Sequence, residues 1–288
     1  MIIEREIARR TTAIVATYER PNHLDTLIHS FRSSYPGLPF VVADNSVNKY
    51  PRNDVDYLKI EAGSGISISR NQALSRVTSE FTLLVDDDHI CLPETRIDRM
   101  IDFLLKNNID LIAGRTIETR SEQFDFHGCY QFDRNTIYHY IGVASVQHAQ
   151  WEQFDVTPNF FVARTAMLKQ IAWDPNLRFA KEHDDFFLRA REANFKVSYL
   201  PDVSLLNNSA VCHHGGSKGA HCEEYFFDKW QAVDKIEVRW IRAPFPRLSF
   251  YSTRFKASIE PTKDQFKDAY KMFENMYPDF EVLDPFEC

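Results

Sequence analysis

The 288-residue chain lacks the features that mark several large classes of protein. Its five cysteines are scattered without a CxxC pair, which favours reduced thiols in a cytosolic protein over a disulfide framework. Its net charge of -7 argues against nonspecific nucleic-acid binding as its main task. No segment approaches the ~18 uncharged apolar residues of a membrane span, and the N-terminus lacks the apolar core of a signal peptide. We therefore expect a soluble protein.

Two common nucleotide-binding motifs are also missing, because the chain contains neither GxGxxG nor GxxxxGK[ST]. There is no internal repeat and no low-complexity linker. The hydrophobic content of 44% is ample for a full core. These observations indicate one large domain, or one domain with an appendage.

Strand-like runs alternate with helical patterns through the first half of the chain. We expect strands at residues 13–16, 40–43, 81–85 and 111–114, and helices at residues 23–34, 68–77 and 96–107. This alternation predicts an α/β fold with a mainly parallel, nucleotide-binding sheet flanked by helices. Residues 115–160 suggest twisted strands and loops. Residues 223–288 are aromatic and charged, which suggests helices and loops wrapping the core.

Three consecutive carboxylates, Asp86, Asp87 and Asp88, follow a short apolar run. Like charges in a row repel one another, so they need a cation or full exposure to solvent. In an open α/β sheet the ligand crevice lies at the carboxyl ends of the strands. The triplet therefore predicts a site for a hard divalent cation and a phosphate-bearing ligand, with a solvated acidic loop as the alternative.

Four short motifs follow one another in a particular order, at residues 16–21, 42–46, 65–71 and 84–88. This series resembles GT-A fold glycosyltransferases of the family 2 type, which use a nucleotide-activated sugar and a divalent metal. A later series, at residues 159–165, 173–175 and 183–188, is similar to the ganglioside GM2/GD2 synthase group. Those enzymes are β-1,4-N-acetylgalactosaminyltransferases. The resemblance covers about residues 11 to 220 and implies a GT-A fold with a smaller mixed acceptor-side sheet.

The resemblance implies roles for the acidic triplet. Asp88 is expected to bind the metal and Asp86 the ribose, while Asp87 could substitute for either. A histidine after the last core strand is a frequent metal ligand in related enzymes, which makes His214, and next His213, the candidates. A histidine beside carboxylates suits Mn²⁺ better than Mg²⁺.

Four further residues are expected to contact the nucleotide. Asp44 resembles the residue that binds uracil or ribose, although Asp-Asn-Ser is also good turn chemistry. Thr17 and Glu19 would line the base. Arg70 looks like the family's nucleotide-contacting arginine, with a surface salt bridge as the alternative.

Lys218 follows the histidine pair and a Gly-Gly step, where it could pair with the diphosphate.

A carboxylate near the acceptor hydroxyl is needed as general base in an inverting transfer. The family's usual Glu-Asp is replaced here by Glu182-His183-Asp184-Asp185. Aligning on the following Phe pair favours Asp185 as the base, with Asp184 second. Counting from Glu182 places His183 at the base position instead.

Four side chains are candidates for contact with the donor or acceptor sugar. Asn159 could hydrogen-bond a sugar, and Trp173 could stack on one. Phe160 and Phe161 could do the same, although aromatic residues are more often part of the core.

These patterns together predict a metal-dependent inverting glycosyltransferase. Its donor would be a UDP-sugar, with N-acetylgalactosamine as the first guess, and its acceptor a hydroxyl of a glycan or glycolipid. We expect a cytoplasmic protein in bacterial surface polysaccharide or lipooligosaccharide synthesis. The basic and aromatic C-terminal region is compatible with a peripheral contact at the inner membrane face.

The predicted catalytic domain spans residues 1–222. It divides into a nucleotide-sugar half at 11–114 and an acceptor half at 115–222, and residues 223–288 form a helical extension. Two rival functions are a non-catalytic nucleotide-sugar or glycan-binding protein and a sugar nucleotidyltransferase. The second is disfavoured because the loop after the first strand is neither Gly-rich nor basic.

Overall fold

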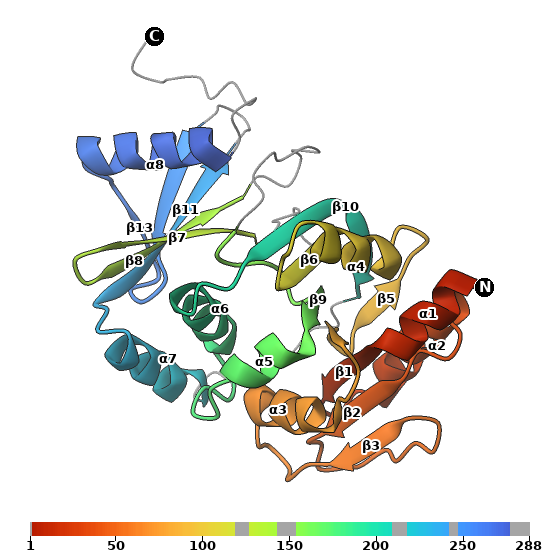
Figure 1. The fold of residues 1–288 in the computed structure, drawn as a ribbon. Coiled ribbons are helices and arrows are strands. Elements are labelled where there is room, and N and C mark those ends of the chain that lie inside the picture. Colours follow the sequence, from red (N-terminus) through yellow and green to blue (C-terminus); the bar gives the residue numbers. More distant parts are fainter. Residues whose placement is uncertain (1, 119–126, 143–153, 209–217, 242–246, 277–288) are drawn as a thin grey trace.

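A computed structural model describes residues 2–118, 127–142, 154–208, 218–241 and 247–276. Two sheets form its centre, with helices packed around them (Figure 1). None of the helices in these ranges is long and apolar enough to cross a membrane.

The larger sheet has eight strands in the order β3-β2-β1-β4-β9-β6-β10-β5. Their bounds in that order are Asp56–Lys59, Phe40–Asp44, Thr11–Thr17, Phe81–Leu84, Phe161–Arg164, Leu111–Glu118, Val197–Asn207 and His89–Cys91. Strands β1 to β4 pair in parallel, whereas β9 runs antiparallel to both of its neighbours. This arrangement confirms the predicted mainly parallel α/β sheet.

Strand β1 shows why the sheet forms here. Ala13, Ile14 and Val15 are completely buried, so both faces of the strand are covered, as in the central strand of a parallel sheet. Ala13 and Val15 belong to one hydrophobic core and Ile14 to the other. The alternation of side chains along the strand therefore divides the core into two layers.

Helices cover both faces of this sheet. Helices α1 (Ile2–Arg10), α2 (Pro21–Ser34) and α4 (Ile97–Lys106) contribute to one core, whereas α3 (Ile66–Arg76), α5 (Thr165–Ile171) and α6 (Glu182–Glu192) contribute to the other. Helix α2 begins with a proline, which suits the first turn because its missing N–H has no intrahelical partner there. Its buried side chains recur at helical spacing: Leu24, Leu27, Ile28 and Phe31.

The second sheet has five strands in the order β13-β12-β11-β8-β7. Their bounds are Ala257–Ile259, Arg247–Ser252, Asp234–Ile241, Thr136–Ile141 and Gly128–Asp133. Strand β11 pairs with β8 in parallel, so the sheet is mixed, as expected. Helices α7 (Lys218–Lys229) and α8 (Lys263–Met276) accompany it, and α6 lies between the two sheets (Figure 1).

The C-terminal region differs from the expected helices and loops in one respect. Residues 234–259 form three strands that continue the sheet begun by β7 and β8. The sequence did not indicate them, because the first of them, β11, pairs with β8, about a hundred residues earlier in the chain. A boundary at residue 222 would split this sheet.

We therefore expect a chain that ends at residue 222 to be much less stable than the full chain. It would lose β11, the partner of β8, and Lys235, which pairs with the buried carboxylate of Asp184. Removing one partner of a buried ion pair alone costs about 3–5 kcal/mol. Urea unfolding followed by circular dichroism measures this loss. A chain ending at residue 276 is the control, and equal midpoints for the two truncations would contradict the expectation.

Candidate active site

Polar residues from three neighbouring strands meet at one edge of the larger sheet. Thr17 ends β1, Asp44 ends β2, and the two residues are paired in register. The acidic triplet follows β4, and the Thr17 hydroxyl donates to Asp87 Oδ2 at 2.8 Å. The carboxyl ends of these parallel strands thus bring these polar side chains together at one edge of the sheet.

Arg70 is buried, with 1% of its surface exposed, and holds Asp86. Its Nη2 donates to Asp86 Oδ1 at 2.7 Å, and its guanidinium lies 5.5 Å from the ring centre of Trp173. Although burial raises the pKa of Asp86, Arg70 brings that pKa below its ordinary value. The alternative of a surface salt bridge is therefore wrong for Arg70.

Two donors of this guanidinium lack a partner. Arg70 Nε and Nη1 are buried and make no hydrogen bond within the described part of the chain. A buried N–H group without an acceptor is costly, which points to an anionic or carbonyl-bearing ligand beside Arg70.

Arg70 lies on helix α3, and the glycine that precedes this helix lets it pack closely against the segment around Arg178. Gly65 precedes the helix with a φ of 93°, and a Cβ there would lie 2.5 Å from the Arg178 carbonyl oxygen. The Ile66 N–H donates to the same carbonyl at 2.9 Å. A glycine is therefore required for the close approach of the two segments.

A chain of contacts leads from the triplet to the start of α6. Asn159 Nδ2 donates to Asp86 Oδ2 at 3.3 Å, and Asn159 Oδ1 lies 2.7 Å from His183 Nδ1. Since the Asn159 amide nitrogen donates to the carboxylate, its oxygen is left to accept, and His183 Nδ1 carries the proton. Burial is the main cause that lowers the pKa of His183 to about 4, so its imidazole is neutral near pH 7.

The other two carboxylates of the triplet share a cation that sequence analysis did not single out. Arg20 Nη1 donates to Asp87 Oδ1 at 2.9 Å and to Asp88 Oδ2 at 3.0 Å. Burial, opposed by Arg20 and assisted by repulsion from Asp88, raises the pKa of Asp87 to about 6. Arg20 lies within the first of the four motifs, directly before the proline that opens α2.

The charges at this edge suit a divalent cation. Three carboxylates of the triplet face two guanidinium groups, those of Arg20 and Arg70, which leaves one negative charge in excess. Carboxylate oxygens are the ligands that Mg²⁺ and Mn²⁺ accept. Among the residues that the structure describes, no three His, Cys, Asp or Glu side chains converge on one point. Asp88 contributes one carboxylate of the type that such a metal accepts, without two further ligands beside it among these residues.

The predicted histidine ligands cannot be placed here. His213 and His214 lie outside the described residues, and Lys218 begins α7 with a side chain that is also outside them.

Asp44 is buried and already accepts three hydrogen bonds. They come from the Ser46 N–H at 2.8 Å, the Tyr50 N–H at 3.2 Å and the Tyr57 hydroxyl. Although burial raises the pKa of Asp44, the bonds from Ser46 and Tyr57 bring it below its ordinary value. Asp44 thus shapes the turn after β2, which was the alternative role.

Glu19 joins two loops at this edge. Its carboxylate accepts from the Val47 N–H at 2.6 Å and the Asn48 N–H at 3.0 Å, while its own N–H donates to Ser46 Oγ at 2.7 Å. The hydrogen bond from Asn48 is the main cause that lowers the pKa of Glu19. This carboxylate holds the turn that surrounds Asp44.

The aromatic candidates for sugar contact are buried in the core. Phe160, Phe161 and Trp173 are each at most 2% exposed. Phe161 stacks on Phe186 with ring centres 6.1 Å apart, and Trp173 stacks on the same ring at 5.0 Å. The prediction of sugar stacking is therefore wrong for these three, and the core alternative holds.

The Trp173 ring instead packs against the Arg70 guanidinium. The residue that holds the Trp173 backbone, Asn71, was not predicted from the sequence. The Asn71 side chain donates to the Trp173 carbonyl at 2.7 Å and accepts from the Trp173 N–H at 2.8 Å. Asn71 stands next to Arg70 in the third of the four motifs. One helix thus carries both the buried cation and the amide that fixes the ring beneath it.

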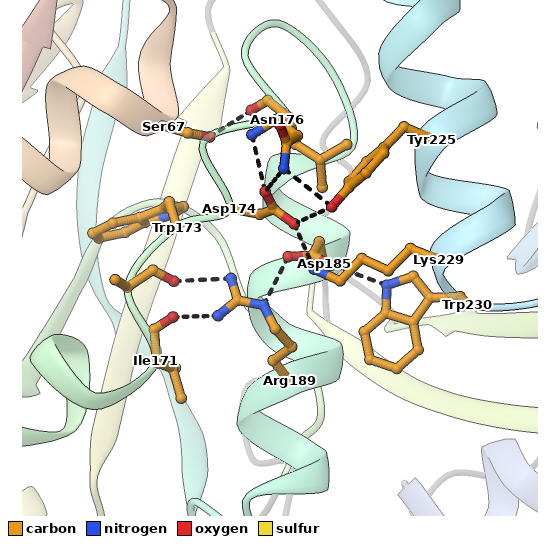
Figure 2. A network of polar contacts seen from close by, with 12 residues as sticks. Ser67, Ile171, Trp173, Asp174, Asn176, Asp185, Arg189, Tyr225, Lys229 and Trp230 are labelled. Carbon is orange, nitrogen blue, oxygen red and sulfur yellow. Dashed lines mark hydrogen bonds and ion pairs between the residues drawn. The ribbon is translucent and has the colours of Figure 1, made fainter.

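The preferred base, Asp185, is not brought together with the triplet. It is completely buried, and within the described ranges its side-chain partners are Arg189, Lys229 and Trp230, as Figure 2 shows. Asp184 accepts instead from the second sheet. Among residues 182–185, which open α6, His183 is the one that is hydrogen-bonded to Asn159 and through it to Asp86. Helix positions one or two apart face different directions, so the neighbouring side chains do not share this contact.

Comparison with known proteins assigns the family. The model of glycosyl transferase family 2 matches residues 12–172, more than half of the chain. The mouse β-1,4 N-acetylgalactosaminyltransferase 2 is 30% identical over 199 residues, which are 64% of this chain and 37% of that protein. The human β-1,4 N-acetylgalactosaminyltransferase 1 is 28% identical over 76% of this chain and 43% of its own length.

Solved structures agree with the fold. The crystal structure of S. aureus TarS in complex with UDP-GlcNAc matches with a TM-score of 0.50 and 20% identity, over 73% of this chain and 61% of that one. A second crystal structure of TarS matches with the same TM-score at 21% identity, over 69% and 37%. The chain spans less than half the length of the two N-acetylgalactosaminyltransferases that it matches. It belongs to glycosyl transferase family 2 and has the GT-A fold.

Proposed function

We infer that this protein transfers a sugar from a UDP-sugar to a hydroxyl group of a glycan, with inversion and with the help of a divalent metal. The observation that carries the proposal is the buried Arg70, whose two unpartnered donors lie beside the acidic triplet at the carboxyl edge of the parallel strands. This pairing of a cation for phosphate or ribose oxygens with carboxylates for a metal suits a nucleotide diphosphate.

The nucleoside is proposed to lie against the loops after β1 and β2. Asp44 is proposed to meet the base or ribose there, and Glu19 maintains the turn around it. Thr17 orients Asp87 rather than pointing at solvent, because its hydroxyl is used in that contact. Asp86, 29% exposed at its side chain, is the member of the triplet with room to meet the ribose.

The metal is proposed to bind at Asp88, with His214 or His213 as a further ligand. When bound it would neutralise the diphosphate and stabilise it as a leaving group. Lys218, at the start of α7, is proposed to pair with the same phosphates. Arg20 holds Asp87 and Asp88 close together, so a ligand that needs both carboxylates finds them preorganised.

The donor sugar is proposed to be an N-acetylhexosamine. The supporting facts are the N-acetylgalactosaminyltransferase names of the curated relatives and the UDP-GlcNAc in the TarS complex. N-Acetylgalactosamine is the first candidate and N-acetylglucosamine the second. The acceptor is proposed to be a bacterial surface glycan or lipooligosaccharide, built at the inner face of the membrane.

UDP binding should depend on Mn²⁺, because a diphosphate without a cation would approach a site with excess negative charge. In calorimetry, we expect UDP to bind with Mn²⁺ present and to bind at least tenfold more weakly in EDTA, a difference of about 1.4 kcal/mol. A protein that binds no UDP with Mn²⁺, or binds it equally in EDTA, would contradict the proposal.

Replacing the buried cation tests the nucleotide site directly. Arg70→Met removes the donors that face the ligand and leaves Asp86 unpaired, so UDP affinity should fall at least tenfold, about 1.4 kcal/mol or more. Arg70→Lys should recover only part of it, because a lysine cannot reproduce the planar fork. Calorimetry measures both.

The matched control for these variants is Arg76→Met on the same helix, whose side chain is 58% exposed. Its UDP affinity should equal that of the unmodified protein. Equal losses in the Arg70 and Arg76 variants would show that α3, and not the buried guanidinium, determines binding.

A peripheral membrane contact is proposed for one end of the second sheet. Phe255 is 70% exposed and Val233 53% exposed, and Arg254 Nη1 donates to the Val233 carbonyl at 3.0 Å. Arg254 and Lys256 flank Phe255 in the turn between β12 and β13. An apolar side chain between two cations suits an anionic lipid surface.

Sedimentation with vesicles tests this contact. The protein should bind phosphatidylglycerol vesicles more than phosphatidylcholine vesicles, and Phe255→Ser should reduce that binding several-fold. Val47→Ser, at another exposed apolar residue (67%), is the control. Binding that is insensitive to lipid charge or to Phe255→Ser would contradict the assignment.

A further inference from the structure

Asp184 ties the start of α6 to the second sheet. Its Oδ1 accepts from Lys235 Nζ on β11 at 2.6 Å and from the Tyr130 hydroxyl on β7 at 2.8 Å. Lys235 is 1% exposed, so this ion pair is buried. Although burial raises the pKa of Asp184, the Lys235 ammonium brings that pKa far below its ordinary value. Asp184 therefore stays charged and bound, and does not exchange protons near pH 7.

Asp185 ties the same turn to the end of α7. Its carboxylate accepts from Lys229 Nζ at 2.7 Å, Trp230 Nε1 at 3.0 Å and Arg189 Nε at 2.8 Å (Figure 2). Its side chain has no exposed surface. A carboxylate that is fully buried and holds three donors cannot approach an acceptor hydroxyl in this arrangement.

The contacts of Asp184 and Asp185 restrain neighbouring residues of one helical turn. Consecutive helix positions are about 100° apart, so the two carboxylates hold the turn from two directions. One contact runs to β11 and the other to α7, which are both C-terminal to residue 217. A turn held in this way is restrained in rotation and in sliding, which fixes the direction of the preceding residue, His183.

His183 points toward the triplet and is oriented by it. Asp86 accepts from the amide nitrogen of Asn159, so the Asn159 oxygen accepts from His183 Nδ1. The imidazole also packs edge-on against Phe187, with ring centres 5.0 Å apart. This tautomer leaves the lone pair on Nε2, the form in which a neutral imidazole accepts a proton.

We propose that His183 is the general base and that Asp184 and Asp185 are positioning residues that aim it, an inference that rests on the proposed sugar transfer. As the acceptor oxygen bonds to the anomeric carbon, the bond from that carbon to the diphosphate oxygen breaks and its electron pair leaves with UDP. The acceptor proton moves to His183 Nε2. The resulting imidazolium later releases this proton to solvent.

The charges around His183 have both signs. Asp86, beyond the β4 strand, and Asp184, on its own helix, favour the imidazolium, whereas Arg70 on α3 and Lys235 on β11 oppose it. The imidazole is therefore neutral before the transfer. Once it is protonated, the carboxylate of Asp86 stabilises it through Asn159.

The decisive comparison is between His183→Ala and Asp185→Asn. UDP-N-acetylgalactosamine with Mn²⁺ serves as substrate, and UDP release to water is measured with UDP affinity by calorimetry. His183→Ala should lower kcat by about 10²–10⁴-fold, with donor KM and UDP affinity within twofold of the unmodified chain. Added imidazole should restore part of that kcat, which the loss of a purely structural residue would not allow.

Asp185→Asn should lower kcat by less than tenfold. Lys229→Met should match it, and Lys229→Arg, which keeps the cation, should retain more than half of kcat. The control is Glu192→Gln, an exposed residue at the far end of α6, with unchanged kcat. An Asp185→Asn protein that binds UDP normally but loses as much kcat as His183→Ala would overturn the proposal, as would a His183→Ala protein with full kcat.

A paired substitution covers the case in which single variants do not fold. Asp184→Leu with Lys235→Met removes both charges together and leaves no buried ion unpaired. We expect a folded protein with normal UDP affinity and kcat lowered about 10–100-fold. Unchanged kcat would overturn the positioning role of Asp184. A starting protein that binds no UDP would overturn the proposed function itself, a different result from these.

Discussion

The contact on which the rest of the site depends is the ion pair between Arg70 and Asp86. Arg70 has almost no exposed surface, so its charge is tolerated only because a carboxylate lies 2.7 Å away. The Trp173 ring lies 5.5 Å from the guanidinium, and the Asn71 side chain holds the Trp173 backbone. With Asp86 held in place, its second oxygen can orient Asn159, and through it His183. One buried cation thus sets the geometry from the acidic triplet to the start of α6.

Helix α6 contacts three separate parts of the chain, and these contacts together fix its position beside the site. Phe186 and Phe187 pack on the larger sheet, Asp184 is bound to the second sheet, and Asp185 is bound to the end of α7. The C-terminal strands and α7 therefore act on the arrangement of His183 although they lie outside the region that the family model matches. Asp184 and Asp185 are thus both buried and both bound to side chains from the C-terminal part of the chain.

The sequence predicted the part of the site that depends on local order along the chain. Strand ends in a parallel sheet share one edge, so the triplet, Thr17 and Asp44 could be placed together without coordinates. The sequence favoured Asp185 over His183 as the base, but that choice depends on the direction of one helical turn, which the sequence does not reveal. That direction is set by Lys235 and Trp230, which lie 51 and 45 residues away from their partners.

The tautomer of His183 reports on the link from Arg70 through Asp86 to α6, since it follows from the orientation that Asp86 imposes on Asn159. Heteronuclear NMR of protein labelled with ¹⁵N-histidine, assigned by comparison with His183→Gln, reads the two ring nitrogens separately. We expect a neutral ring at pH 7 with the proton on Nδ1 and an unprotonated Nε2, and loss of this preference in Asn159→Ala. A proton on Nε2, or an imidazolium at that pH, would contradict it.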